Sequence, residues 1–354
     1  MPMLTHLKSN CLLITYIRIR NFLMCFLAAL FISACESEHT GPQLTGLTMG
    51  TSYSIQWADN NLNIDQNALS SEVEARLERI NALMSTYIAD SELSQFNQSR
   101  DTGWHAVDIE LATLVEQALT ICQQSKGAFD VTVGPLVNLW GFGANDANFQ
   151  FPNATEINIA MRSIGCQHLD VRLSPPAINK HLSEIYVDLS AIAKGYAVDQ
   201  LAVILDNHKL NNYMVEIGGE VKAKGVAPHG NPWRIGIETP QAQRSHIEAI
   251  ISLQDIAVAT SGDYRNYFEH EGQRYSHTID PLNGYPVKHQ LASVTVLHES
   301  TAMADAWATA FMVLGANESL RLSEIHGLSG LLITRDNDQY QSTSFGNMKN
   351  YFTN

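Results

Sequence analysis

The chain has 354 residues, of which 45% are hydrophobic and 16% are charged. This length and composition suffice for a buried core and exclude a disordered polypeptide. The formal net charge of -14 disfavours nucleic acid as a partner, so we expect none. The sequence has room for one large domain or two modest ones.

The first 34 residues have the pattern of an export signal. Basic residues precede an apolar run at 22–31, which is too short for a stable membrane-spanning helix. The run ends in Ile32-Ser33-Ala34-Cys35, which resembles a bacterial lipoprotein cleavage box. We therefore expect a signal peptide at 1–34, then a lipidated Cys35 with a tether at 35–43, anchored on the periplasmic face of a bacterial membrane. A plain secretory signal that is cleaved nearby is the alternative.

Hydrophobic periodicity predicts the main elements of the folded part. Helices are expected at 71–84, 111–124, 190–205 and 300–314. Strands are expected at 53–57, 185–189, 213–216, 233–238, 257–260, 274–279, 292–297 and 330–334, with a polar loop at 145–153. Because the helices cluster early and the strands late, we expect an α+β fold with antiparallel sheet rather than a doubly wound one. No GxGxxG or Walker pattern is present, so a Rossmann dinucleotide site is not predicted.

Two cysteines remain beyond Cys35, at Cys122 and Cys166. Cys122 falls on the apolar face of the helix expected at 111–124, which is typical of a buried structural thiol. Export would permit a disulfide between the two, but the sequence alone does not pair them. The chain has no CxxC and no His/Cys cluster, so no zinc site is predicted.

The stretch Ser276-His277-Thr278-Ile279-Asp280-Pro281 places an imidazole near a carboxylate and a rigid turn. Histidine is the side chain best suited to move a proton near neutral pH. The expected strand stops at Pro281, because proline has no N–H for a ladder. A lone histidine is more often structural than catalytic, so the prediction of a catalytic role for His277 depends on the other motifs of the chain. Asp280 either orients the ring or terminates the strand, and we favour the second.

The helix expected at 300–314 carries Asp305 and Thr309 at i and i+4, so both side chains point to one face. A carboxylate and a hydroxyl are hard oxygen ligands of the kind that magnesium takes. The alternative is an exposed Asp305 with Thr309 bonded back to its own helix. An unpaired carboxylate in so apolar a helix would be costly, which favours a cation.

A third block runs from Tyr186 to Asp199, where the strand expected at 185–189 leads into a helix. Such a junction presents free backbone N–H groups and the positive end of a helix dipole. Lys194 adds a mobile cation in the first turns, and the setting suits a phosphate or diphosphate. The alternative is an ordinary capped helix with a surface lysine.

Together these three blocks resemble those of the FAD:protein FMN transferase family, the ApbE-like flavin transferases. Further stretches match the family in order from about residue 44 to near the C-terminus, so we expect one transferase domain at 44–354. These stretches are Thr48–Tyr53, Met84–Tyr87, Asp90–Asn97, Gly127–Pro135, Trp140–Phe142, Ile217–Val221 and Thr260–Tyr264.

The resemblance implies a T-fold-like core of antiparallel sheet with packed helices, and a flavin cleft between the core and added elements. It implies Mg²⁺-dependent transfer of the FMN moiety of FAD to a threonine hydroxyl of an acceptor protein, with release of AMP. His277 would be the base, and Asp305, Thr309 and the carbonyl of Ala191 the cation ligands. The family often has a side-chain hydroxyl at this third position, and Ala191 has none. The residues matched to FAD contacts are Met49, Tyr87, Ala128, Phe129, Asp130, Asp188, Lys194 and Ile279.

The family suggests acceptors among membrane redox subunits, such as those of the sodium-pumping NADH:quinone reductase and the Rnf complex. Two other functions stay open. Water could replace threonine, which would make the protein a Mg²⁺-dependent FAD pyrophosphatase that yields FMN and AMP. The protein could also be a lipoprotein that binds FAD without turnover, although the set of His277, Asp305 and Thr309 argues against this.

Overall fold

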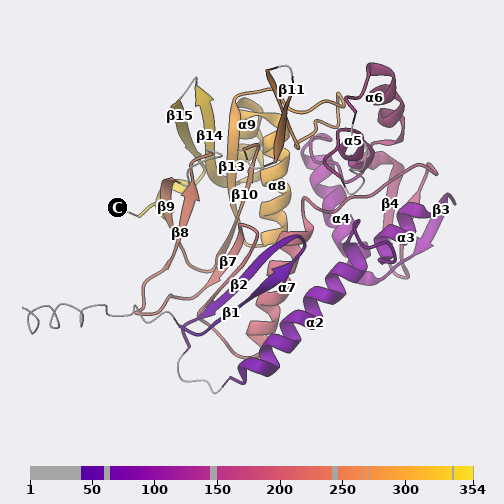
Figure 1. Ribbon diagram of the computed structural model, residues 1–354. Coiled ribbons are helices and arrows are strands. Elements are labelled where there is room, and N and C mark those ends of the chain that lie inside the picture. Colours follow the sequence, from indigo (N-terminus) through magenta and orange to yellow (C-terminus); the bar gives the residue numbers. More distant parts are fainter. Residues whose placement is uncertain are drawn as a thin grey trace, which may run out of the picture. The chain divides into compact units, whose positions relative to one another are not determined.

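A computed structural model describes residues 41–59, 64–143, 150–240, 246–264, 266–270, 272–336 and 339–353 (Figure 1). The expected signal peptide, Cys35 and most of the expected tether lie outside these residues, as does 144–149 of the expected loop. Residues 150–153 of that loop have no regular structure. Within the described ranges, no helix is long and apolar enough to cross a membrane.

The main sheet has eight strands in the order β1-β2-β6-β7-β10-β13-β14-β15, and every neighbouring pair is antiparallel. This confirms the predicted α+β fold with antiparallel sheet. The strands are β1 (Gln43–Thr48), β2 (Thr51–Trp57), β6 (Tyr213–Ile217), β7 (Glu220–Lys224), β10 (Ile256–Gly262), β13 (Leu291–His298), β14 (Ser329–Asp336) and β15 (Gln339–Phe345).

Three smaller sheets surround it. One contains β3 (Gly103–Ala106), β5 (Pro176–Lys180) and β4 (Leu169–Leu173), another β8 (Trp233–Glu238) and β9 (Ile247–Leu253), and the last β11 (Tyr267–His270) and β12 (Gln273–Ser276). The helices are α2 (Gln66–Met84), α3 (Glu92–Gln98), α4 (Ile109–Gln124), α5 (Gly134–Leu139), α6 (Ala154–Ala160), α7 (Ala193–Asn207), α8 (Thr301–Leu314) and α9 (Ala316–His326). Short 3-10 helices are η1 (Met161–Ser163), η2 (Cys166–His168) and η3 (Met348–Tyr351).

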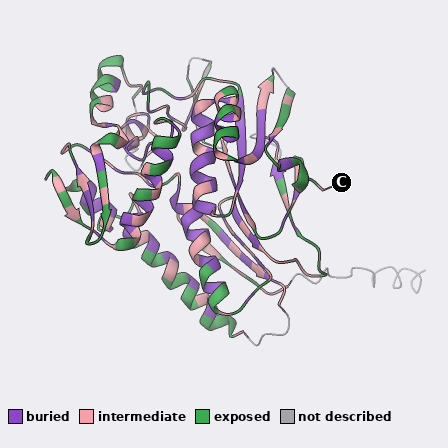
Figure 2. Ribbon diagram, turned by 180° about the vertical axis from the view of Figure 1, so that it is seen from behind, coloured by how far each residue is buried: buried purple, intermediate pink, exposed green. Residues whose placement is uncertain are grey.

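Each face of the main sheet has its own core. On one face α7 packs over β6 and β7, and α8 packs over β10 and β13 (Figure 1). On the other face β8 and β9 cover apolar residues of β7, β10, β13 and β14. α8 is buried along almost its whole length (Figure 2). Its alanine-rich sequence explains this, because small side chains let neighbouring elements approach closely.

Asp199 of α7 caps the start of α8. Its carboxylate accepts hydrogen bonds from the backbone N–H groups of Thr301 and Ala302, at 3.0 and 3.1 Å. The first N–H groups of a helix have no acceptor within that helix, so this cap satisfies two of them. A Cβ on Gly195 would clash with the carbonyl oxygen of Thr301, so glycine permits the close approach. The N-terminal turns of α7 and α8 are therefore fixed against each other.

Several predicted boundaries are wrong for local reasons. Residues 185–189 form no strand, because Val187 exchanges hydrogen bonds with the side chain of Asn97 instead of joining a ladder. The helix expected from Ser190 begins at Ala193. The strand expected at 274–279 ends at Ser276, whose hydroxyl accepts from the N–H of Thr278.

The early helix starts at Gln66 rather than at 71, because Asp65 caps it. The predicted helices at 111–124 and 300–314 and the strand at 233–238 are confirmed, with changes of at most two residues at any end.

Candidate active site

A cleft of about 840 Å³ opens at the edge shared by the main sheet, α7, α8 and β8. Segments 128–137 and 277–281 complete its walls. Most residues predicted for the site line it, although they come from distant parts of the chain. They are Tyr87, Ala128, Phe129, Asp130, Asp188, Ala191, Lys194, His277, Ile279, Asp305 and Thr309.

Met49 does not belong to the lining. It occupies the turn between β1 and β2 with a positive φ of 50°, and its side chain packs against the helix-side core. Its neighbours Thr51 and Ser52 do line the cleft. The segment that the resemblance matched therefore reaches the cleft, but through those two residues.

α8 directs Asp305 and Thr309 to the same wall. Asp305 is only 3% exposed, and its Oδ2 accepts a hydrogen bond from the N–H of Gly195 at 3.2 Å. Thr309 Oγ1 lies 3.1 Å from Ser261 Oγ on β10. An exposed Asp305, the alternative considered from the sequence, is therefore wrong. The pair presents a buried carboxylate and a hydroxyl to the cleft.

Lys194 lies at the second position of α7, between two carboxylates. Its Nζ is 2.9 Å from Glu220 Oε1 and 3.7 Å from Asp305 Oδ2. Burial alone would lower the pKa of Lys194, but the charges of Asp305 and Glu220 raise it above its ordinary range. Lys194 therefore stays cationic inside the cleft, and it is not an ordinary surface lysine.

Glu220 is the site residue that sequence reasoning missed. It is 3% exposed, lines the cleft, and follows the glycine pair Gly218-Gly219. Burial raises the pKa of Glu220, and Lys194 opposes that rise. The pattern of β7 alone would not have found it, because Lys222 and Lys224 share the strand with Glu220 and no apolar run marks this carboxylate as buried.

His277 lies just after β12, and Asn266 holds its ring. Because a carbonyl oxygen only accepts, His277 Nδ1 carries the proton and donates to Asn266 O at 3.0 Å. Nε2 is then the basic nitrogen. Burial lowers the pKa of His277. Asp280 does not orient the ring, since its two oxygens accept from Leu282 N and Asn283 Nδ2, as expected for a residue that shapes the turn.

The residues matched to flavin and adenine contacts differ in exposure. Tyr87 is 69% exposed, whereas Phe129 is 2% exposed and belongs to the core. Asp188 Oδ1 accepts from the N–H and hydroxyl of Ser190, at 2.9 and 2.6 Å. Phe129 lines the cleft from within the core, so little of its ring is open to a ligand.

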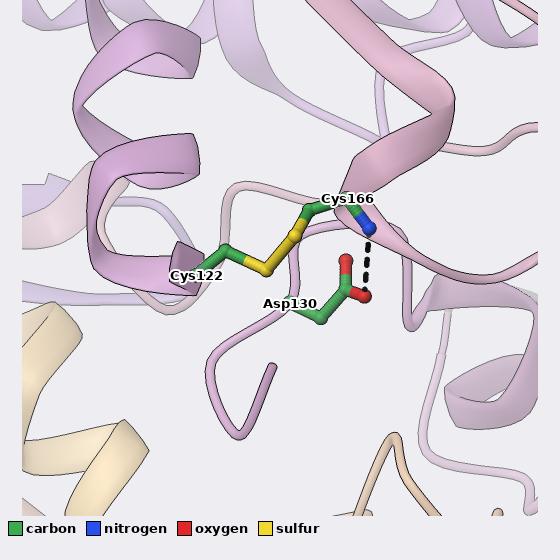
Figure 3. A group of neighbouring side chains, drawn as sticks. All are labelled: Cys122, Asp130 and Cys166. Carbon is green, nitrogen blue, oxygen red and sulfur yellow. Dashed lines mark hydrogen bonds between the residues drawn. A yellow bond between two sulfur atoms is a disulfide. The ribbon is translucent and has the colours of Figure 1, made fainter. Parts of the chain in front are cut away.

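Asp130 connects the cleft to a disulfide (Figure 3). Cys122, at the end of α4, is bonded to Cys166, at the start of η2. Asp130 Oδ2 accepts from the N–H of Cys166 at 3.1 Å, and Oδ1 accepts from the N–H and hydroxyl of Thr132. Burial raises the pKa of Asp130. The disulfide leaves this group of Cys122, Asp130 and Cys166 no thiolate with which to bind a metal.

Comparison with known proteins places the chain in a family. The model of the ApbE family matches residues 49–332. A Vibrio cholerae protein named FAD:protein FMN transferase is 42% identical over 92% of this chain and 98% of its own length. The Haemophilus influenzae protein of the same name is 40% identical over 89% of this chain and 93% of its own length.

Solved structures agree with this assignment. The flavin transferase ApbE from Vibrio cholerae has a TM-score of 0.81 at 42% identity, over 88% of this chain and 98% of that one. The flavinyl transferase ApbE of Pseudomonas stutzeri, in its apo form, also has a TM-score of 0.81, at 38% identity over 88% and 96% of the two chains. The matched range, residues 49–332, contains every residue that lines the cleft, and on this evidence the chain belongs to the ApbE family.

Proposed function

We propose that this protein is a Mg²⁺-dependent FAD:protein FMN transferase. In the reaction, a threonine oxygen of an acceptor protein forms a bond to the phosphorus of the FMN half of FAD. The P–O bond to the AMP half breaks, and AMP leaves. The observation that carries the proposal is the convergence of His277, Lys194 and the Asp305–Thr309 pair on one cleft.

His277 acts as the general base. Its Nε2 is unprotonated because Asn266 fixes the proton on Nδ1 and burial lowers the pKa of the ring. It takes the proton of the incoming threonine hydroxyl, a contribution of roughly 10²–10⁴ in rate. Lys194 is a fixed positive charge at the diphosphate, where negative charge is concentrated on the donor.

The donor chemistry of Asp305 and Thr309 fits a magnesium ion, because both offer hard oxygens from one helix face. The carbonyl of Ala191, which also lines the cleft, would be the third protein ligand. A bound ion would supply positive charge that neutralises the diphosphate. So few protein ligands leave room for oxygens of the donor itself.

The remaining residues hold FAD. Tyr87 offers a ring face for stacking, and Asp188 an acceptor for ribose or adenine donors. Ala128, Phe129, Asp130 and Ile279 shape the wall, and Met49 supports it from the β1–β2 turn. A rigid grip of this kind matters because phosphoryl transfer depends mainly on position and charge.

The proposed location is the periplasmic face of a bacterial membrane, with the chain anchored through a lipid on Cys35. The disulfide between Cys122 and Cys166 supports an oxidising compartment, because such bonds are rare in the cytosol. Acceptors in that location would be subunits of the NADH:quinone reductase or Rnf type.

The test is to incubate the protein, purified from Glu36 onward, with FAD, Mg²⁺ and a threonine-bearing acceptor domain. We expect AMP release and flavin fluorescence that stays on the acceptor in a denaturing gel. An acceptor with that threonine changed to alanine is the matched control and should stay dark. Asp305→Ala should lose both products. AMP and free FMN without labelled acceptor would instead establish a pyrophosphatase, and bound FAD without products a flavin-binding lipoprotein.

A further inference from the structure

Glu220 is a buried carboxylate with one oxygen in use. Oε1 accepts the hydrogen bond of Lys194 Nζ at 2.9 Å. Oε2 is buried and has no hydrogen-bond partner among the described residues. Because buried polar atoms are nearly always paired, such an oxygen at a cleft wall points to a functional constraint on the side chain.

The turn before β7 makes room for this carboxylate. Gly218 has a φ of 62°, which favours glycine, and a Cβ there would lie 3.5 Å from Glu220 Oε2 and 3.0 Å from Thr51 Cγ2. A Cβ would thus be tight against Thr51 and in ordinary contact with Oε2, and the turn places Glu220 in the cleft wall beside Lys194 of α7.

Lys194 lies between two carboxylates, and its Nζ is closer to Glu220 than to Asp305. The distance from its Nζ to Asp305 Oδ2 is 3.7 Å, which is longer than a hydrogen bond. Asp305 Oδ2 takes the N–H of Gly195 instead. This matters for a cation site, because an ammonium group bonded to Asp305 would compete with a divalent cation for the same oxygens.

We propose that Glu220 is a positioning residue that holds the Lys194 ammonium away from Asp305, so that Asp305 remains available to a divalent cation. Lys194 then serves the diphosphate while Asp305 serves the ion, and the two positive charges stay on separate carboxylates. The proposal rests on the function proposed above, since that function assigns Asp305 to the cation.

Glu220→Gln tests this, because glutamine keeps the shape of the side chain and removes its charge. Among the described residues, Asp305 is then the carboxylate that remains in an ion pair with Lys194, and the ammonium should move to it. The probe is Mn²⁺, with free Mn²⁺ measured by electron paramagnetic resonance in the absence of FAD and acceptor. We expect the Mn²⁺ dissociation constant to rise about tenfold in Glu220→Gln.

A double-mutant cycle separates this role from a direct effect on the ion. In the Lys194→Met background there is no ammonium to move, so adding Glu220→Gln should change Mn²⁺ affinity less than about twofold. The matched control is Glu216→Gln, which removes a carboxylate of the same cleft that bonds Gly219 N rather than Lys194. This control should bind Mn²⁺ like the parent protein.

Two results would overturn the proposal. One is unchanged Mn²⁺ affinity in Glu220→Gln, and the other is an equal loss with and without Lys194, which would mean that Glu220 acts on the ion directly. If Glu220→Gln does not fold, Glu220→Asp decides, because it keeps the charge with a shorter reach. When Lys194 is present, Glu220→Asp should bind Mn²⁺ more weakly than the parent. In the Lys194→Met background, the same substitution should leave Mn²⁺ affinity unchanged. A protein that binds Mn²⁺ as expected but transfers no flavin would refute the proposed function alone.

Discussion

Burial lowers the pKa of His277, and the carbonyl of Asn266 and the charge of Asp263 oppose this only in part. The nearby Asp280 uses both oxygens in the following turn, so it does not orient the ring through a hydrogen bond. A base with this arrangement is neutral over a wider pH range than an exposed histidine. A lower pKa also makes the imidazole a weaker base. It increases the fraction of unprotonated imidazole, which a general base for the acceptor hydroxyl requires.

The pH dependence of the transfer reaction should reflect this histidine. The base works when it is unprotonated, so activity should fall as pH drops through its pKa. Because burial lowers that pKa, the acid limb of kcat/KM should have its midpoint below the ordinary value of 6.5. His277→Ala should lose the limb and roughly 10²–10⁴ in kcat. An acid limb that persists unchanged in His277→Ala would assign it to another group.

Individual site residues differ in how far the sequence could predict them. Asp305 and Thr309 were predictable because helix periodicity alone places them on one face. Glu220 was not, because its importance comes from the close approach of Lys194, which is 26 positions away in sequence. Met49 was predicted to contact the ligand but does not line the cleft. A motif match places a segment at the cleft but does not say which side chain of a turn faces it.

At the scale of elements, the site depends on the contact between α7 and α8. Lys194 lies at the start of α7, and Asp305 lies one turn into α8. The cap from Asp199 and the absence of a side chain at Gly195 set their spacing. The distance between Lys194 and the proposed cation ligand Asp305 is therefore fixed only as long as the two helix ends stay in contact.

Gly195→Ala should test that contact. In an isolated helix this change would stabilise by about 1 kcal/mol, because alanine is the better helix former. Here the new Cβ meets the carbonyl of Thr301, so we expect a loss of about 1–3 kcal/mol in the free energy of unfolding. Mn²⁺ affinity should fall with it.

Val203→Ala is the matched control for this experiment, since Val203 is an exposed position of α7. It should leave the free energy of unfolding within about 0.5 kcal/mol. If denaturant melts give both variants the stability of the parent protein, the two helix ends have more freedom than their contacts indicate.

The elements that the sequence predicted well are those whose pattern is local. α4 and α8 repeat apolar residues at helical spacing over several turns, and both were placed within two residues. Residues 185–189 are just as apolar, but the amide of Asn97 takes the hydrogen bonds that a neighbouring strand would have made. No local pattern reveals a partner 90 positions away.

At the scale of the whole molecule, the disulfide joins the helical part of the chain to the wall of the cleft. Removing it with Cys122→Ser and Cys166→Ser should lower the free energy of unfolding by about 2–4 kcal/mol, given the 44 positions between the cysteines. It should also weaken FAD binding, because Asp130 loses the fixed N–H of Cys166.

Calorimetric melts and a flavin-fluorescence titration would measure the two effects. Replacing the cysteines should change FAD affinity even at a temperature where the variant is fully folded. A variant that binds FAD as tightly as the parent under those conditions would limit the disulfide to a stabilising role.

The disulfide supports the cleft wall through the hydrogen bond between Cys166 and Asp130, so flavin attachment would depend on the cell's own supply of oxidising equivalents for thiols. If the chain is exported while disulfide formation is impaired, the transferase would lack the bond that fixes Cys166 beside Asp130 in the cleft wall. Its acceptors would then be made in normal amounts but would lack their flavin. A defect in thiol oxidation would thus look, in respiration, like the loss of a redox cofactor.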